Sequence, residues 1–222
     1  ITGMFYENSL NSGIVPQIAA IMGACTGGAA YSAALCDFVV QVEKTGHVFI
    51  TGPAVIKEVT GEEVSFEELG GTKVHSTKSG VSHLSAKDDK ECLDLIRRLL
   101  DFLPQNNREK PIRKSCADPV EREVPELIDI VPIRMSKVYD MKKVIRTIVD
   151  EGDFFEIHPA FAGNVVVGFA RMGGQVVGIV ANNPRNLGGC LDIDSSDKAA
   201  RFIRTCDAFN IPLISLVDVP GF

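Results

Sequence analysis

The sequence has little that would suit a nucleic-acid-binding or membrane-spanning protein. Acidic residues outnumber basic ones, 29 to 23, which gives a formal net charge of −6, and no stretch is rich in Lys or Arg. This balance argues against a nucleic-acid footprint, although a local site for a small anion can be positive on an acidic protein. The longest apolar stretches have the length of a strand and are interrupted by glycine or polar residues, so no segment is expected to cross a bilayer.

The cysteine pattern argues against two further classes of site. None of the six cysteines lies at the Cys-x-x-Cys spacing. Because they are scattered in apolar contexts, they indicate reduced structural residues of an intracellular protein rather than a disulfide framework. A zinc site would need ligands at short, regular spacing, so no metal site is expected. The six are Cys25, Cys36, Cys92, Cys116, Cys190 and Cys206.

Both ends of the sequence indicate a piece of a longer protein. The sequence begins without an initiator methionine, and it stops at Phe222, directly after an apolar run and a Pro-Gly turn. A domain seldom ends where a buried strand has just delivered the chain to a loop. We therefore expect the internal part of a longer chain, inactive by itself.

The first half of the chain has the pattern of alternating strands and helices. Residues 14–22 form an apolar run that predicts a strand, and the small residues from Gly27 onward predict a short helix. Two more strands are expected at residues 37–42 and 47–50, and loops with short helices at 58–81. Residues 86–103 predict an amphipathic helix that Pro104 ends. Its apolar face is expected to hold Cys92, Leu95, Ile96, Leu99, Leu100 and Leu103.

The second half follows a segment, residues 105–138, that is rich in proline, charge and asparagine and predicts a linker. Beyond it we expect a helix from about Asp140 to Glu151, with Met141, Val144, Ile145, Ile148 and Val149 facing inward. Two strands joined by Gly173-Gly174 predict a hairpin. The pattern ends with a helix and a buried strand. The helix starts at 194–197 and is expected to bury Ala199, Phe202, Ile203 and Cys206, and the strand follows at 212–219. The sequence thus predicts an α/β fold with two domains, residues 1–104 and 139–222.

Gly27-Gly28-Ala29 is the junction best suited to chemistry. It lies where a strand gives way to a helix, and the first N–H groups of a helix lack internal partners and carry the positive end of its dipole. Glycine allows a ligand oxygen to approach these amides closely, which favours an oxyanion such as a thioester enolate. Close packing of helix against strand explains the same small residues equally well. The phosphate loop and the dinucleotide fingerprint are excluded, because the Lys-Ser/Thr pair and the glycine spacing are missing.

Other polar residues are weaker candidates. The four histidines have no nucleophile or carboxylate at a motif spacing and are expected to be structural or exposed. Ser32 lacks the turn of a hydrolase nucleophile, and Cys25 is interpreted as a small core residue rather than a thiolate. Asp192 and Asp194 resemble a helix cap and turn more than metal ligands. The histidines are His47, His75, His83 and His158.

Several stretches, in the right order along nearly the whole chain, resemble the carboxyltransferase (beta) subunits of biotin-dependent acyl-CoA carboxylases, those of the propionyl-CoA type most of all. The stretches that carry the resemblance include Ile21-Met22-Gly23 with Gly27-Gly28-Ala29, Phe49-Ile50-Thr51-Gly52-Pro53, Ser79-Gly80-Val81-Ser82-His83, Val177-Gly178-Ile179-Val180-Ala181-Asn182, Gly189-Cys190-Leu191-Asp192-Ile193, Lys198-Ala199-Ala200-Arg201-Phe202 and Val217-Asp218-Val219-Pro220-Gly221-Phe222.

The resemblance implies two crotonase-like domains built from repeated ββα units, both incomplete here. It implies a ring-shaped homo-hexamer that works with a partner alpha subunit, the biotin carboxylase and biotin carrier, in an α6β6-type assembly. The partner consumes ATP, Mg and bicarbonate, and carboxybiotin then delivers its carboxyl group to the α-carbon of an acyl-CoA such as propionyl-CoA. The backbone amides of Gly27, Gly28 and Ala29 would stabilise the enolate. Gly221 and Phe222 would lead toward biotin, whose own glycine pair is expected beyond Phe222.

The sequence departs from the family pattern at Ala24, Thr26 and Ala54, where proline, alanine and an acidic residue are usual. Two alternatives stay open: a biotin-linked acyl-CoA decarboxylase subunit coupled to a sodium pump, and a non-catalytic scaffold. The family implies the mitochondrial matrix for a eukaryotic source and the cytoplasm for a prokaryotic one.

Overall fold

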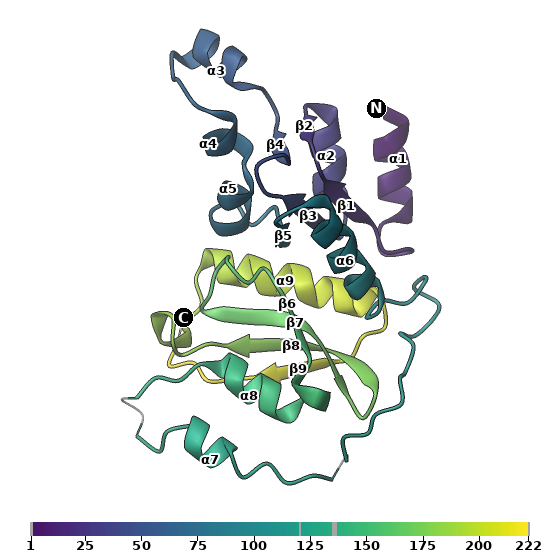
Figure 1. Ribbon diagram of the computed structural model, residues 1–222, viewed down its shortest axis with the longest axis vertical. Helices are drawn as coiled ribbons and strands as arrows, with labels where there is room; N and C mark the ends of the chain where they lie inside the picture. Colours follow the sequence, from purple (N-terminus) through teal and green to yellow (C-terminus); the bar gives the residue numbers. More distant parts are fainter. Residues whose placement is uncertain (1, 120, 135–136, 222) are drawn as a thin grey trace. The chain divides into compact units, whose positions relative to one another are not determined.

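A computed structural model describes residues 2–119, 121–134 and 137–221 of the chain (Figure 1). The chain forms two compact units, Ile1–Leu100 and Asp101–Phe222. Each unit has its own sheets and core, so each is described by itself. The division into domains at 1–104 and 139–222 with a linker at 105–138 stays a prediction.

The first unit repeats a strand–strand–helix arrangement. The first strand of each repeat enters a parallel three-stranded sheet of order β1-β3-β5, and the second strands pair with each other as the parallel sheet β2-β4. The elements are α1 (Thr2–Asn11), β1 (Ile18–Ile21), β2 (Ala24–Thr26), α2 (Gly28–Leu35), β3 (Phe38–Val42), β4 (His47–Phe49), α3 (Pro53–Thr60), α4 (Phe66–Gly70), α5 (Thr72–Thr77), β5 (Leu84–Ala86) and α6 (Asp89–Leu100).

The core of the first unit lies around β3, whose five residues are all buried. Ile21, Ala30, Ala33, Val39 and Val48 form one apolar cluster between the sheets and α2. The small side chains of Ala30 and Ala33 allow α2 to pack closely on the strands. The strands expected at 37–42 and 47–50 and the helix from Gly27 are therefore confirmed, while the strand expected at 14–22 is confined to β1.

Two expectations for the first unit are wrong. β2 was not expected, because three residues are too few for a period to show, and only its pairing with β4 makes it a strand. The helix expected to run to Leu103 ends at Leu100. Cys92 and Leu99 are fully buried as expected, but Leu100 is 51% exposed, and Leu103 lies beyond the end of the helix.

The second unit is a four-stranded mixed sheet between two helices. In Figure 1, α8 lies on one face of the sheet and α9 on the other. β6, β7 and β8 are antiparallel neighbours, and β9 adds parallel to β8 after the crossover through α9. The elements are α7 (Leu127–Ile130), α8 (Met141–Ile148), η1 (Asp150–Gly152), β6 (Phe154–Ile157), β7 (Val165–Met172), β8 (Gln175–Asn182), η2 (Leu187–Gly189), α9 (Ile193–Ala208) and β9 (Leu213–Leu216).

Apolar side chains on both faces hold this sheet. Met141, Ile145 and Val149 pack on one face, with Val144 and Ile148 at the margin of the same cluster, so the inward face expected for this helix is confirmed. On the other face α9 approaches so closely that a Cβ on Gly178 would lie 2.7 Å from Cys206 Sγ. The hairpin predicted around Gly173-Gly174 is also confirmed, with Met172 opposite Gln175.

Three boundaries in the second unit differ from expectation. α8 ends at Ile148, because Val149 is extended and Glu151 has a positive φ of 53°. α9 begins at Ile193, slightly before the start expected at 194–197; its N-cap is Asp192, one of the two residues interpreted as a cap, and the Asp192 carboxylate accepts from the Ser195 N–H in a capping box. β9 is half exposed rather than buried, with Leu213 38% exposed, because β8 is its only neighbour in the described part of the sheet.

The segment expected as a linker is held on the β7–β8 turn. Arg113 donates from Nε and Nη2 to the Gly173 carbonyl (3.0 and 2.8 Å), and the Lys114 N–H donates to the Gly174 carbonyl (3.0 Å). The Asp150 carboxylate accepts from the N–H groups of both glycines. Burial alone would raise the pKa of Asp150, but these hydrogen bonds lower it below its ordinary value.

We expect Gly174→Ala to destabilise this turn. Gly174 has a φ of +76°, and an added Cβ would collide with the Lys114 backbone carbonyl. Gly61 has the same φ but no atom within 4 Å of its Cβ position, so Gly61→Ala is the matched control. The free energy of unfolding from a urea titration should fall by about 2 kcal/mol more for Gly174→Ala than for Gly61→Ala, since overpacking typically costs 1–3 kcal/mol. Equal losses would show that the Lys114 contact is unimportant.

Candidate active site

The start of α2 is shaped by an unusual backbone conformation at Gly27. Its φ of 58° and ψ of −129° favour glycine, and no side chain caps the helix. The Gly27 carbonyl accepts from the N–H groups of Ala30 and Tyr31, which closes the first turn of the helix. Because Gly27 is the N-cap, the amides of Gly28 and Ala29 are the first two of the helix and cannot bond within it.

The three expected oxyanion donors are not equivalent. The Gly27 N–H donates to the carbonyls of Phe49 and Ile50, both at 3.2 Å. For the N–H groups of Gly28 and Ala29, no backbone or side-chain acceptor is found among the described residues. Gly28 is half-buried and Ala29 exposed, so both are accessible. The arrangement offers two free donors at a positive helix end, with Gly27 fixing their direction; their role in catalysis stays a prediction.

Strand pairing places a second helix start at the same edge of the sheet as the first. β2 and β4 are parallel and pair Thr26 with Phe49, so their carboxyl ends share one edge of the sheet. α2 follows β2 and α3 follows β4, with Gly52 as N-cap and Pro53 at its first position. Helix N-termini at the carboxyl edge of parallel strands are suited to an anionic group.

The other candidate residues from the sequence have structural roles. Burial raises the pKa of the Cys25 thiol, which makes it a poor nucleophile. The Ser32 hydroxyl donates to Asn8 Oδ1 (2.7 Å). Among the described residues, no hydrogen bond joins Ser32 to a histidine. Asp192 is a cap, as expected.

The histidines are bound to backbone or packed in the core. His75 Nε2 donates to the Val48 carbonyl (2.7 Å), and its Nδ1 lies 2.8 Å from the Ser79 hydroxyl. His83 Nδ1 accepts from the Val39 N–H (3.1 Å), and His158 packs on Phe161. His47 pairs with Glu67 at 2.8 Å. Across residues 2–119, 121–134 and 137–221, no cluster of three His, Cys, Asp or Glu could hold a metal ion.

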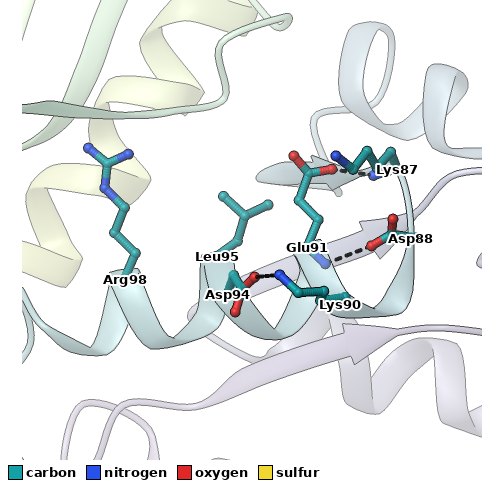
Figure 2. Close-up of a pocket in the computed structure, with 7 residues that line it drawn as sticks. All are labelled: Lys87, Asp88, Lys90, Glu91, Asp94, Leu95 and Arg98. Carbon is teal, nitrogen blue, oxygen red and sulfur yellow. Dashed lines mark hydrogen bonds and ion pairs between the residues drawn. The ribbon is translucent and has the colours of Figure 1, made fainter.

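An open groove of about 370 Å³ lies along α6, apart from the candidate oxyanion site (Figure 2). Its charged residues bind one another: Lys90 pairs with Asp94 at 2.8 Å, and the Glu91 N–H donates to Asp88 (2.8 Å). None of Gly27, Gly28 and Ala29 lines it. The residues that line it are Lys87, Asp88, Lys90, Glu91, Asp94, Leu95 and Arg98. Such a self-neutralised, solvated face is typical of an amphipathic helix.

One edge of the sheet in the second unit collects several loops. β8 and β9 are parallel, so the segments that follow them, 183–192 and 217–221, leave from the same edge. α8 begins there too, because its first N–H, at Met141, donates to the Asn183 side chain (3.2 Å). Gly221 is half-buried, and no atom lies within 4 Å of its Cβ position. Phe222, expected beside it, lies outside the described residues.

Comparisons with known proteins define the class. The carboxyl transferase domain family matches residues 1–222. The alpha subunit of methylmalonyl-CoA decarboxylase from Propionigenium modestum is 54% identical over 219 residues, which cover 99% of this chain and 42% of that protein. The mitochondrial propionyl-CoA carboxylase beta chain of Sus scrofa is 53% identical over 219 residues, with 99% of this chain and 41% of the relative covered.

A solved structure agrees with the sequence comparisons. The transcarboxylase 12S hexamer with hydrolysed methylmalonyl-CoA bound matches with a TM-score of 0.95 and 52% identity, over 99% of this chain and 43% of that chain. The chain therefore belongs to the carboxyl transferase domain family, and the expected crotonase-like α/β fold is confirmed. It spans less than half the length of these relatives. No helix in the described ranges is long and apolar enough to cross a membrane.

Proposed function

We propose that the protein containing this chain moves a carboxyl group between carboxybiotin and the α-carbon of a short-chain acyl-CoA, in the direction from propionyl-CoA to methylmalonyl-CoA. The observation that carries this proposal is the pair of free amides, Gly28 and Ala29, at the start of α2. Family membership supplies the reaction class, and the transcarboxylase 12S relative binds methylmalonyl-CoA in its crystals.

The two amides suit the charge that this reaction creates. When the α-proton leaves the acyl-CoA, its electron pair moves onto the thioester oxygen, and the C=O bond re-forms as the α-carbon bonds to CO2. Biotin, carried by a partner subunit, would supply the carboxyl group and the base. The part of Gly28 and Ala29 is to donate two hydrogen bonds to the enolate oxygen, and helix N-terminal amides need no reorganisation to do so.

Biotin would be bound by the second unit. Gly221 follows β9 at the edge where several loops meet, and an open Cβ position leaves its backbone accessible. The full proposal includes a homo-hexamer, in an α6β6-type assembly with a biotin carboxylase and carrier subunit that uses ATP, Mg and bicarbonate. The location would be the mitochondrial matrix in a eukaryote and the cytoplasm in a prokaryote.

The reverse reaction is the second candidate. Identity to the decarboxylase subunit, 54%, and to the propionyl-CoA carboxylase chain, 53%, is nearly equal, so similarity favours neither direction. As a decarboxylase subunit, the protein would release CO2 from a carboxylated acyl-CoA by way of biotin, with membrane partners and sodium dependence.

The first test uses the full-length protein with its natural partner. We expect ATP-dependent fixation of labelled bicarbonate onto propionyl-CoA, above that onto acetyl- and methylcrotonyl-CoA. Sodium-dependent decarboxylation of methylmalonyl-CoA without ATP would favour the second candidate. If neither reaction occurs with an intact assembly and a biotinylated partner, only the non-catalytic scaffold remains.

A further inference from the structure

The segment after β9 has little main-chain support. The pairing of β9 with β8 ends where Leu216 lies opposite Ala181. For residues 217–221, no backbone–backbone hydrogen bond is found within the described part of the chain. Val217 is 75% exposed, and Asp218 and Pro220 are exposed too, so burial holds the segment only in part. Its conformation therefore depends on side-chain contacts.

Two contacts meet at Asp218, one at its side chain and one at its main chain. The Tyr139 hydroxyl, which comes from the residue before the N-cap of α8, donates to Asp218 Oδ2 at 2.7 Å. On the main-chain side, Gly189 lies so close that an added Cβ would be 2.6 Å from the Asp218 carbonyl oxygen. Gly189 is itself held in place, because its carbonyl accepts from the Asn182 side chain (2.9 Å). Asp218 is thus held by a hydrogen bond to its carboxylate, and its carbonyl packs closely against Gly189.

Tyr139 is well placed to act as an anchor. Its ring packs against the apolar cluster between α8 and the sheet, the same cluster that Ile214 and Leu216 of β9 contact. Packing of the ring therefore directs the hydroxyl toward the segment that leaves β9. Burial and then the bond to Asp218 raise the pKa of Tyr139 to about 12, so the phenol remains a hydrogen-bond donor at neutral pH.

We propose that Tyr139 is a positioning residue: through its hydrogen bond to Asp218, it holds the 217–221 segment in the conformation that presents Gly221 to biotin. The inference rests on the proposed carboxyl transfer and adds to it a residue 79 positions earlier in the chain, from another element of the unit. Tyr139 itself would touch neither biotin nor acyl-CoA.

The test is made in the full-length protein, by biotin-dependent decarboxylation of methylmalonyl-CoA with free biotin as carboxyl acceptor. We expect Tyr139→Phe to raise the KM for biotin roughly fivefold, since one hydrogen bond contributes about 1 kcal/mol and 1.4 kcal/mol is tenfold. The KM for methylmalonyl-CoA should stay within about twofold, because the expected thioester site belongs to the first unit. Tyr6→Phe, an exposed tyrosine of α1, is the matched control.

Two further pairs of variants separate positioning from other roles. Asp218→Asn keeps an oxygen that can accept from Tyr139 and should keep a near-normal KM for biotin, whereas Asp218→Ala should match Tyr139→Phe. Gly189→Ala should push the segment away and raise the same KM, whereas Gly188→Ala, with a similar positive φ of 62° but no atom within 4 Å, should not.

The outcomes distinguish this inference from the proposed function. If the unaltered protein neither carboxylates nor decarboxylates, the proposed function fails. If it is active and Tyr139→Phe behaves like Tyr6→Phe, or raises the KM for both substrates equally, the positioning role is wrong. If Asp218→Asn strongly lowers kcat/KM for biotin while Tyr139→Phe changes it little, Asp218 would instead have a role in the chemistry.

Discussion

Gly27→Ala is expected to lower the kcat for carboxyl transfer in the full-length protein by roughly 10²-fold, the loss typical of a missing oxyanion donor. An alanine strongly disfavours φ 58° with ψ −129°, so the turn before α2 would relax toward a negative φ. That change would redirect the N–H groups of Gly28 and Ala29, which follow directly in the chain. The Gly27 N–H would also lose its bonds to Phe49 and Ile50. The measurement is kcat and KM for propionyl-CoA with the natural partner.

Gly23→Ala is the matched control for this variant. Gly23 lies four residues earlier, its φ is ordinary, and no atom lies within 4 Å of its Cβ position. It should retain nearly full kcat. Gly28→Val should abolish turnover by placing a branched side chain at one of the two donors. Circular dichroism and oligomer size must remain unchanged in all three variants. If the Gly27→Ala and Gly28→Val variants both assemble correctly and both keep full kcat, only the packing interpretation of these glycines remains.

Local patterns in the sequence predicted the parts of the fold that depend on neighbouring residues. The hairpin was predictable because two apolar runs flank Gly173-Gly174, which takes the positive φ values that the turn requires, 58° and 76°. The start of α2 was predictable from its small residues. In both cases the residues that decide the structure are adjacent in the chain, so one short window contains the whole signal.

The elements that were missed depend on distant partners. β2 has three residues and β6 has four, and each becomes a strand by pairing with β4 or β7. At the candidate site, the sequence placed Gly27, Gly28 and Ala29 together, but it could not show that the Gly27 amide is occupied. The acceptors, Phe49 and Ile50, are reached only through the pairing of β2 with β4.

The face of α9 shows a different limit. From the sequence we expected the buried face to hold Ala199, Phe202, Ile203 and Cys206. In the structure, Ile203 is 39% exposed and Lys198 is only 3% exposed. Lysine belongs to the residues least often buried, so an apolar pattern cannot anticipate it. It is buried because a loop on another element offers carbonyl oxygens, and that loop precedes α9 by more than thirty residues.

Lys198 holds the turn between β6 and β7 from inside. Its Nζ donates to the carbonyls of His158 (3.0 Å), Phe161 (2.7 Å) and Ala162 (3.3 Å). His158 and Ala162 have positive φ values of 54° and 43°, a conformation that favours glycine and needs support from its surroundings. Burial lowers the pKa of Lys198 to about 8. At neutral pH the charged ammonium is thus stabilised by three backbone acceptors and by the charge of the Glu156 carboxylate.

Lys198→Met is therefore expected to destabilise the protein by about 3 kcal/mol at pH 7, because it leaves buried carbonyls without donors. Lys143→Met, an exposed lysine of α8, is the control and should change the free energy of unfolding by less than about 0.5 kcal/mol. Urea titrations of the full-length protein measure both. An effect of Lys198→Met no larger than that of the control would mean that the turn is stable without its donor.

The same pair of proteins gives a pH dependence with a definite sign. The folded-state pKa of Lys198, about 8, lies below its ordinary value of 10.5, so between these pH values the unfolded chain binds more protons than the folded one. The free energy of unfolding of the unaltered protein should therefore rise, relative to that of Lys198→Met, as the pH increases from 8 to 10.5. Cys206 and Tyr139, whose pKa values are each raised to about 12, oppose this trend above pH 9, but they are present in both proteins and cancel in the difference. If the difference in the free energy of unfolding between the two proteins stays constant or becomes smaller from pH 8 to 10.5, Lys198 is not charged and desolvated in the folded protein.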